Sequence, residues 1–255
     1  MHRQLLRPAP AVLRPAAVPE PLRTIRSAPP ALDDQERAEQ PSTELTDSRL
    51  RAIKHGYFAA LSELDHHIGR ILEGLEALGR ADRTMVVLLS DHGEWLGDHL
   101  RLAKGYPADD PVARVPLVMR WPDGIVRPGR RVSDVVELTD VMPTVLQALG
   151  IPVPTDVQGQ SLLSALRDEP LDRLDIAITE HERWTSVRSS THHYLVHEDG
   201  RERLWDMVED PTEHRELGQD RGQDPVVHTA LTRHRCLLLQ RQLQARRELP
   251  RTYPY

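Results

Sequence analysis

A short apolar run that ends abruptly in polar and charged residues constrains this chain more than any other feature. Residues Thr84 to Ser90 read Thr-Met-Val-Val-Leu-Leu-Ser and are rich in residues that favour strands. Because the hydrophobicity is continuous rather than alternating, the run predicts a strand that is covered on both faces, as in a sheet flanked by helices. A second apolar segment, Val115–Met119, predicts a neighbouring strand in a mixed or parallel sheet.

A long amphipathic helix is predicted directly before the first strand. Apolar residues recur mostly every three or four positions from Ile53 to Leu78, so they share one face of a helix. Gly79 stands where a left-handed C-terminal cap is expected. We expect the helix Arg51–Leu78 to pack on the sheet, which gives an α/β sandwich.

Composition divides the chain into three predicted parts. Residues 1–47 form an irregular arm, because seven prolines among the first 30 residues forbid a regular helix or central strand. Residues 48–170 form the α/β domain, and residues 171–255 form a small subdomain with antiparallel strands and a terminal helix. In that helix Cys236 is expected in the core. A dimerisation helix, and hence a homo-oligomer, is the alternative to packing on the domain.

Charge and composition exclude several classes of protein. The chain has 33 Lys and Arg against 39 Asp and Glu, and it has no dense basic block, so no nucleic-acid partner is expected. No run of about 18 apolar residues is present, so no membrane span is expected. A single cysteine excludes an intrachain disulfide. Prolines interrupt every apolar stretch that a secretory signal needs, so a cytoplasmic location is predicted, with an Arg-rich transit peptide as the alternative.

Candidate chemistry is concentrated just after the first predicted strand. Asp91 and His92 offer a carboxylate and an imidazole, and Gly93 lets the backbone turn sharply. Lys104 follows in the same connection. Open α/β sheets bind ligands beyond the carboxyl ends of their strands. Two metal ligands fall short of the three that most metal sites need, so the spacing alone also fits a capped, solvent-exposed strand end.

The residues from Ser90 to His99, with Lys104 and Arg114-Val-Pro-Leu-Val118, resemble the sulfatases of the alkaline phosphatase superfamily. The resemblance runs from about Tyr57 to Leu217. It implies an alkaline phosphatase-like α/β sandwich followed by a small antiparallel sheet and a C-terminal helix. It also implies that Asp91 and His92 are metal ligands and that Lys104 is the catalytic, substrate-binding group on the sulfate or phosphate oxygens. The implied cofactor is a divalent cation, with calcium first and manganese, magnesium or zinc as alternatives.

Two features of the sulfatase pattern have no counterpart in this sequence. Neither the C/S-x-P-x-R nucleophile motif nor the pair of aspartates that completes the metal shell is found. The chain therefore resembles the C-terminal part of a sulfatase, truncated and weakly active or inactive alone, that would act on small-molecule sulfuric esters. The alternatives are a phosphonate monoester or phosphodiester hydrolase, suggested by Gly105-Tyr106 and Asp109-Asp110-Pro111, and a non-catalytic remnant or interaction module.

The predicted site leads to two expectations. The side-chain heads of Asp91, His92 and Lys104 should lie within ~10 Å of a common point, as groups that share one metal-bound anion must. The polypeptide alone should hydrolyse aryl sulfates negligibly and bind divalent cations weakly, because an activated nucleophile is required for the covalent step.

Overall fold

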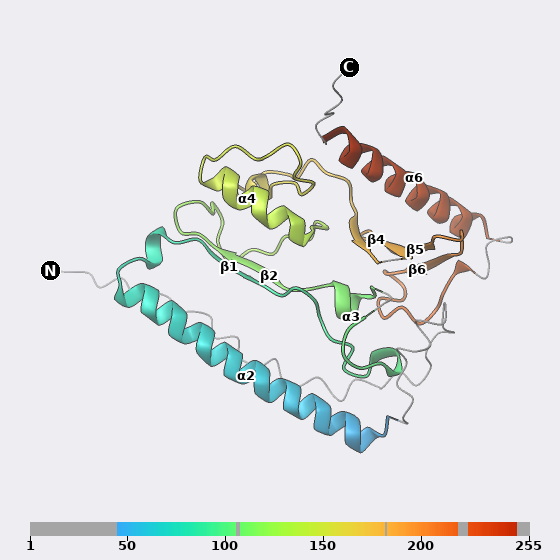
Figure 1. Cartoon of the computed structure of the whole chain (residues 1–255), viewed down its shortest axis with the longest axis horizontal. Coiled ribbons are helices and arrows are strands. Elements are labelled where there is room, and N and C mark those ends of the chain that lie inside the picture. The colour runs from blue at the N-terminus through green and yellow to red at the C-terminus, as the bar shows by residue number, and fades with distance from the viewer. Residues whose placement is uncertain (1–44, 106–107, 182, 219–223, 249–255) are drawn as a thin grey trace.

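The computed structural model describes residues 45–105, 108–181, 183–218 and 224–248, so almost all of the predicted arm at 1–47 lies outside the described residues. The helices are α2 (Asp47–Ala77), α3 (Asp110–Ala113), α4 (Val141–Ala148), α5 (Leu163–Leu166) and α6 (Pro225–Glu248). The strands are β1 (Val86–Leu89), β2 (Leu117–Arg120), β3 (Ala177–Glu180), β4 (Trp184–Arg188), β5 (His192–His197) and β6 (Glu202–Asp206). Figure 1 shows β1 and β2 between α2 and α4, with β3 to β6 and α6 at the other end. This mixed α/β arrangement with antiparallel sheets confirms the predicted fold class.

Helix α2 forms where the sequence predicts it, but it does not pack as expected. Thr46 caps its N-terminus by accepting a hydrogen bond from the Arg49 N–H, and Gly79 follows its end with the expected left-handed φ of +62°. The apolar stripe, however, is only partly covered: Leu61, Leu64 and Ile71 are 41%, 53% and 66% accessible. Its half-buried members are Ile53, Ile68, Leu72 and Leu75. A helix of 31 residues is ~46 Å long, whereas two four-residue strands are only ~13 Å long. The small sheet therefore cannot cover the whole stripe, and the helix is packed over only part of its length, not along Arg51–Leu78 as expected.

The first sheet also differs from its prediction. β1 and β2 pair antiparallel, with Val87 opposite Met119, and the described residues contain no parallel partner for either strand. The described residues between the two strands, 90–105 and 108–116, include α3, and β2 enters the sheet from the opposite end (Figure 1). No residue of β1 or β2 is fully buried. The continuous apolar run thus predicts the position of β1 correctly. It does not predict the antiparallel pairing of β1 or the incomplete burial of its residues.

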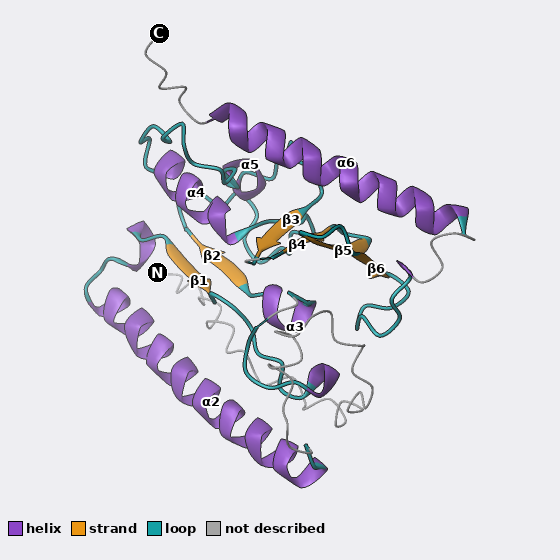
Figure 2. Ribbon diagram, turned by 45° about the vertical axis from the view of Figure 1, so that its right-hand side comes forward, coloured by secondary structure: helices purple, strands orange, loops and turns teal. Residues whose placement is uncertain are grey.

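The second sheet confirms the predicted C-terminal antiparallel strands. β3 to β6 pair in sequence order, and Gly200 turns the chain between β5 and β6 with a φ of +88°. Helix α6 lies along this sheet (Figure 2) and buries one face of it. The core on this face consists of Ile176, Val187, Tyr194 and Leu204 from the sheet region with Val227, Ala230 and Leu231 from α6. The opposite face carries Trp184, Leu195, Trp205 and Met207.

Helix α6 shows one further departure from the sequence prediction. Cys236 is exposed rather than in the core, and His234 is buried against the sheet instead. The His234 ring bonds the Ala230 carbonyl oxygen and the Ser189 hydroxyl, which satisfies both ring nitrogens. No helix within the described ranges combines the length and the apolar character needed to cross a membrane.

Candidate active site

The residues that follow β1 fold into a hydrogen-bonded turn, which we call the Asp-His-Gly turn (residues 91–93). The Asp91 carboxylate accepts the backbone N–H of His92 at 2.9 Å, and the Ser90 hydroxyl donates to the His92 carbonyl oxygen at 2.8 Å. The hydrogen bond from the backbone N–H of His92 is the largest of the interactions that hold the pKa of Asp91 below its usual value. Asp91 is therefore a carboxylate that is ready to accept a cation at neutral pH.

The His92 ring is held in one tautomer. Its Nδ1 lies 2.8 Å from the Gly93 carbonyl oxygen, and since a carbonyl can only accept, Nδ1 carries the hydrogen. Nε2 is then left with a lone pair, and the Lys104 ammonium donates to it at 3.1 Å. The same Nε2 lies 3.7 Å from the Asp91 carboxylate. The three predicted site residues are thus brought together, within the separation that the sequence predicted.

Helix α3 holds the other side of the turn. The Gly93 N–H donates to the Val112 carbonyl oxygen at 2.7 Å, and the Glu94 N–H donates to the Pro111 carbonyl oxygen at 3.1 Å. A Cβ atom at Gly93 would collide with the Pro111 carbonyl group. Glycine is therefore required at this position by the close approach of two backbone segments.

The loop from the turn to Lys104 has an unusual backbone. Leu96, His99, Leu100 and Ala103 all have positive φ values, between 47° and 65°. Each such non-glycine residue costs about 1–2 kcal/mol, so the surrounding contacts must impose this path. His99 approaches a different carboxylate, because its Nε2 lies 3.9 Å from Asp109. Burial lowers the pKa of His99 and raises that of Asp98.

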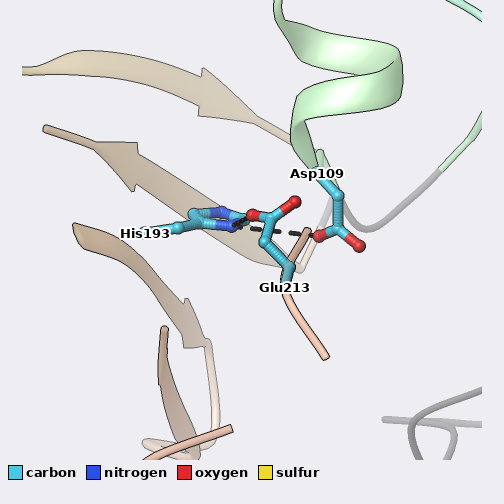
Figure 3. A group of neighbouring side chains, drawn as sticks. All are labelled: Asp109, His193 and Glu213. Atoms are coloured by element: carbon cyan, nitrogen blue, oxygen red, sulfur yellow. Dashed lines mark hydrogen bonds and ion pairs between the residues drawn. The ribbon is translucent and has the colours of Figure 1, made fainter. Parts of the chain in front are cut away.

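A buried group of three side chains lies on the far side of α3. Asp109 precedes α3, His193 comes from β5, and Glu213 comes from the loop after β6 (Figure 3). One ligand atom from each lies within 4.8 Å of the others, so the group is a possible metal-binding triad. In the described geometry His193 Nδ1 already donates directly to Glu213, and His193 Nε2 faces the Ser186 hydroxyl at 2.7 Å.

The charges around His193 decide its protonation. Burial alone would lower its pKa, but the charge and hydrogen bond of Glu213 and the charges of Asp109 and Asp110 together raise it. The imidazolium form therefore fits this pocket, as a cation between carboxylates. Its ring stacks on Trp205, with ring centroids 5.1 Å apart.

The sequence interpretation missed this buried group. It names Asp109-Asp110-Pro111 only as a stretch similar to phosphonate monoester and phosphodiester hydrolases, and it assigns no role to His193 or Glu213. Strand alternation carries the missing signal, because His193 and Leu195 share a face of β5 and that face is buried. Nothing in the sequence spacing brings Glu213 to Asp109, since they are about 100 residues apart.

Comparisons with known proteins identify the family to which this chain is similar. The sulfatase family model matches residues 24–151, and the model of the N-sulphoglucosamine sulphohydrolase C-terminal region matches residues 106–241. An arylsulfatase of Clostridium perfringens is 31% identical over 175 residues, which is 64% of this chain and 35% of that protein.

Solved structures give the same result. The protein BT4656, in complex with its substrate D-glucosamine-2-N,6-O-disulfate, has a TM-score of 0.67 and 27% identity over 78% of this chain and 42% of that one. The phosphonate monoester hydrolase of Agrobacterium radiobacter has a TM-score of 0.72 and 26% identity over 80% of this chain and 44% of that one. This chain thus spans about a third of the arylsulfatase and less than half of either solved structure. With family models matching across both the turn and the C-terminal sheet, the chain belongs to the sulfatase family of the alkaline phosphatase superfamily.

Proposed function

We propose that this chain supplies the metal-binding turn and the anion-binding lysine of a hydrolase of sulfuric esters. The observation that carries the proposal is the meeting of Asp91, His92 and Lys104, with Lys104 Nζ 3.1 Å and Asp91 Oδ2 3.7 Å from the same His92 nitrogen. A carboxylate, a neutral imidazole and an ammonium at one point suit a divalent cation and a tetrahedral anion side by side.

The donor set fits a divalent cation. Gly93 fixes the His92 tautomer so that Nε2 offers its lone pair, and the lowered pKa of Asp91 keeps its carboxylate charged. We propose calcium first, with manganese, magnesium or zinc as the alternatives that an imidazole ligand allows. When bound, such a cation polarises an ester oxygen and stabilises negative charge on it.

In this proposal Lys104 changes its partner when a cation binds. Its ammonium donates to the His92 lone pair that a cation would need, so it must leave that nitrogen when His92 acts as a ligand. The freed ammonium then lies beside the cation site and can neutralise charge on a sulfate oxygen. Lys104 is thus the proposed catalytic and substrate-binding residue.

A phosphonate monoester or phosphodiester hydrolase is the second candidate. It is supported by the similarity to the Agrobacterium radiobacter enzyme and by 36% identity over 132 residues to the multifunctional alkaline phosphatase superfamily protein PehA of Trinickia caryophylli. Sulfate and phosphonate esters share tetrahedral oxyanion geometry, so the three side chains would serve either reaction.

The test is an assay of the purified chain with aryl sulfates and phosphonate monoesters, with each of the four cations added. Because the C/S-x-P-x-R motif does not occur in this sequence, we expect negligible turnover and weak cation binding that is lost in Asp91→Ala. Adding a separate polypeptide that carries the nucleophile motif of a relative should restore turnover, and the preferred ester then identifies the substrate class. Cation binding that is equal in the native chain and Asp91→Ala would overturn the proposal and favour a non-catalytic module.

A further inference from the structure

We propose that Glu213 and Arg188, which lie in the C-terminal subdomain, are positioning residues for the Asp-His-Gly turn and act on it through α3. The inference rests on the proposed function for the role of the turn, but the contacts that carry it stand independently. They form an unbroken series of hydrogen bonds from the four-stranded sheet to the backbone of Gly93 and Glu94.

The first link joins the C-terminal sheet to α3. Glu213 accepts the backbone N–H of Asp110 at 3.0 Å through one carboxylate oxygen and bonds His193 through the other. Arg188, at the end of β4, donates two hydrogen bonds to the Asp110 carboxylate. Its Nε lies 2.8 Å from Oδ1, and its Nη2 lies 3.2 Å from Oδ2. Glu213 is almost wholly buried, so water does not compete for its bonds.

The second link joins α3 to the turn. A helix of one turn leaves its last carbonyl oxygens without intrahelical partners, and two of them are used here. The Val112 oxygen accepts the Gly93 N–H, and the Pro111 oxygen accepts the Glu94 N–H. The turn is therefore fixed to α3 by its backbone, directly beside Asp91 and His92.

The four-stranded sheet positions α3, and not the reverse, because the sheet is the larger and more stable element. Four residues are too few to form a stable helix alone, so α3 takes its position from what holds it. Glu213 and Arg188 hold it from a four-stranded sheet with its own core. The position of the turn, and hence the approach of His92 to Lys104, depends on residues about 100 positions later in the chain.

Amide hydrogen exchange tests this inference in the full chain. In Glu213→Ala, exchange at Gly93 and Glu94 should rise by at least about tenfold relative to the amides of α4, as expected when charge-assisted bonds are lost. Arg188→Gln, which removes the two bonds to Asp110 and a local bond to the Ser189 carbonyl oxygen, should raise exchange at the same two amides by a smaller factor. Glu213→Gln keeps an acceptor for Asp110 and should restore part of the protection.

Glu202→Ala is the matched control. Glu202 is a half-buried carboxylate in the same sheet, and it is bonded to Tyr194 and Arg235. This variant can lower overall stability, but exchange at Gly93 and Glu94 relative to α4 should not change. If Glu202→Ala and Glu213→Ala raise exchange at those two amides equally, then Glu213 stabilises the fold only in general, and the inference is overturned.

A second readout separates this inference from the proposed function. Broadening of the His92 ring signal by Mn²⁺ reports binding at the turn, and Glu213→Ala should weaken that binding severalfold while Asp91→Ala abolishes it. Selective exchange changes with no Mn²⁺ binding in any variant would support the positioning role and overturn the proposed function. Mn²⁺ binding that requires Asp91, with exchange unaffected by Glu213→Ala, would overturn the positioning role and leave the function standing.

Discussion

At the scale of single residues, the chemistry of the turn is set by backbone partners. Gly93 contributes its carbonyl oxygen to fix the His92 tautomer and its N–H to bind α3, so one residue without a side chain serves both neighbours. His193 shows the opposite case, because its protonation is set by the charges of neighbouring side chains. Burial strengthens the effect of these charges because water does not screen them. The two residues lead to separate predictions.

Replacing Gly93 by alanine adds only one methyl group, but it should disturb the turn strongly. The added methyl group collides with the Pro111 carbonyl, so we expect a loss of about 1–3 kcal/mol in the free energy of unfolding, measured by urea denaturation. Gly74→Ala is the control: nothing lies within 4 Å of a Cβ at that helical position, so a gain of about 0.5–1 kcal/mol is expected. A Gly93→Ala protein as stable as the native chain would contradict the close approach.

His193 predicts a pH dependence of stability. Its pKa is raised in the folded state, so its contribution is fully present below the unfolded pKa of about 6.5 and is lost as the pH rises through the folded value. The difference in unfolding free energy between the native chain and His193→Gln should therefore be largest in mild acid and shrink in alkali.

Urea titrations across a pH series provide the measurement. Burial lowers the pKa of His234, so the difference for His234→Gln should run the other way and shrink as the pH falls below about 6.5. Parallel profiles for the two variants would show that the His193–Glu213 pair is not ionised as described.

At the scale of elements, short helices are held by buried polar networks rather than by their own length. The Asp140 carboxylate, before α4, accepts the backbone N–H groups of Glu137 and Gln160 at 2.7 Å each. It also pairs with Arg173 at 2.5 Å and is fully buried. The start of α4 is thus joined to the segment that leads into β3.

Asp140→Ala should remove this junction. It removes the nearer of the two carboxylates beside the buried Arg173 guanidinium and the acceptor of two partly buried N–H groups, so we expect a loss of about 3–5 kcal/mol in unfolding free energy. Glu198→Gln breaks the exposed pair with Arg183 and should change stability by less than about 1 kcal/mol. Chemical denaturation compares the two, and losses of similar size would contradict the role of burial.

How far the sequence predicted these elements depends on the range of the forces involved. Helix α2, its Gly79 end, the strand before Asp91 and the Gly200 turn all follow from local periodicity and turn chemistry. The meeting of Asp91, His92 and Lys104 was also predicted, because 13 residues limit their separation. Strand direction in the first sheet, the exposure of Cys236 and the Asp109–His193–Glu213 group depend on distant partners, which periodicity does not encode.

At the scale of the whole molecule, α2 exposes much of its apolar stripe to solvent. Leu61, Leu64 and Ile71 on this stripe are 41%, 53% and 66% exposed. Apolar surface of this extent favours association with another surface. No segment within the described ranges covers it.

We expect the isolated chain to self-associate through this surface. Leu64→Lys combined with Ile71→Lys should shift the distribution towards monomer, because both side chains lie on the exposed stripe of α2. Val226→Lys, at an exposed position on α6, is the matched control and should leave the distribution unchanged. Sedimentation velocity measures all three, and an unchanged distribution in the double variant would place the association elsewhere.

The hydrogen bond between Asp110 and Glu213 also has a consequence for the order of folding. It joins positions 103 residues apart, whereas β3 to β6 pair only with their neighbours along the chain. Local pairings form before contacts that must close a long loop, so the four-stranded sheet should form early and its bond to α3 late. Stopped-flow measurements should then find faster unfolding in Glu213→Ala with a nearly unchanged refolding rate. During synthesis on the ribosome, the turn at residues 91–93 would reach its final geometry only after residue 213 has emerged.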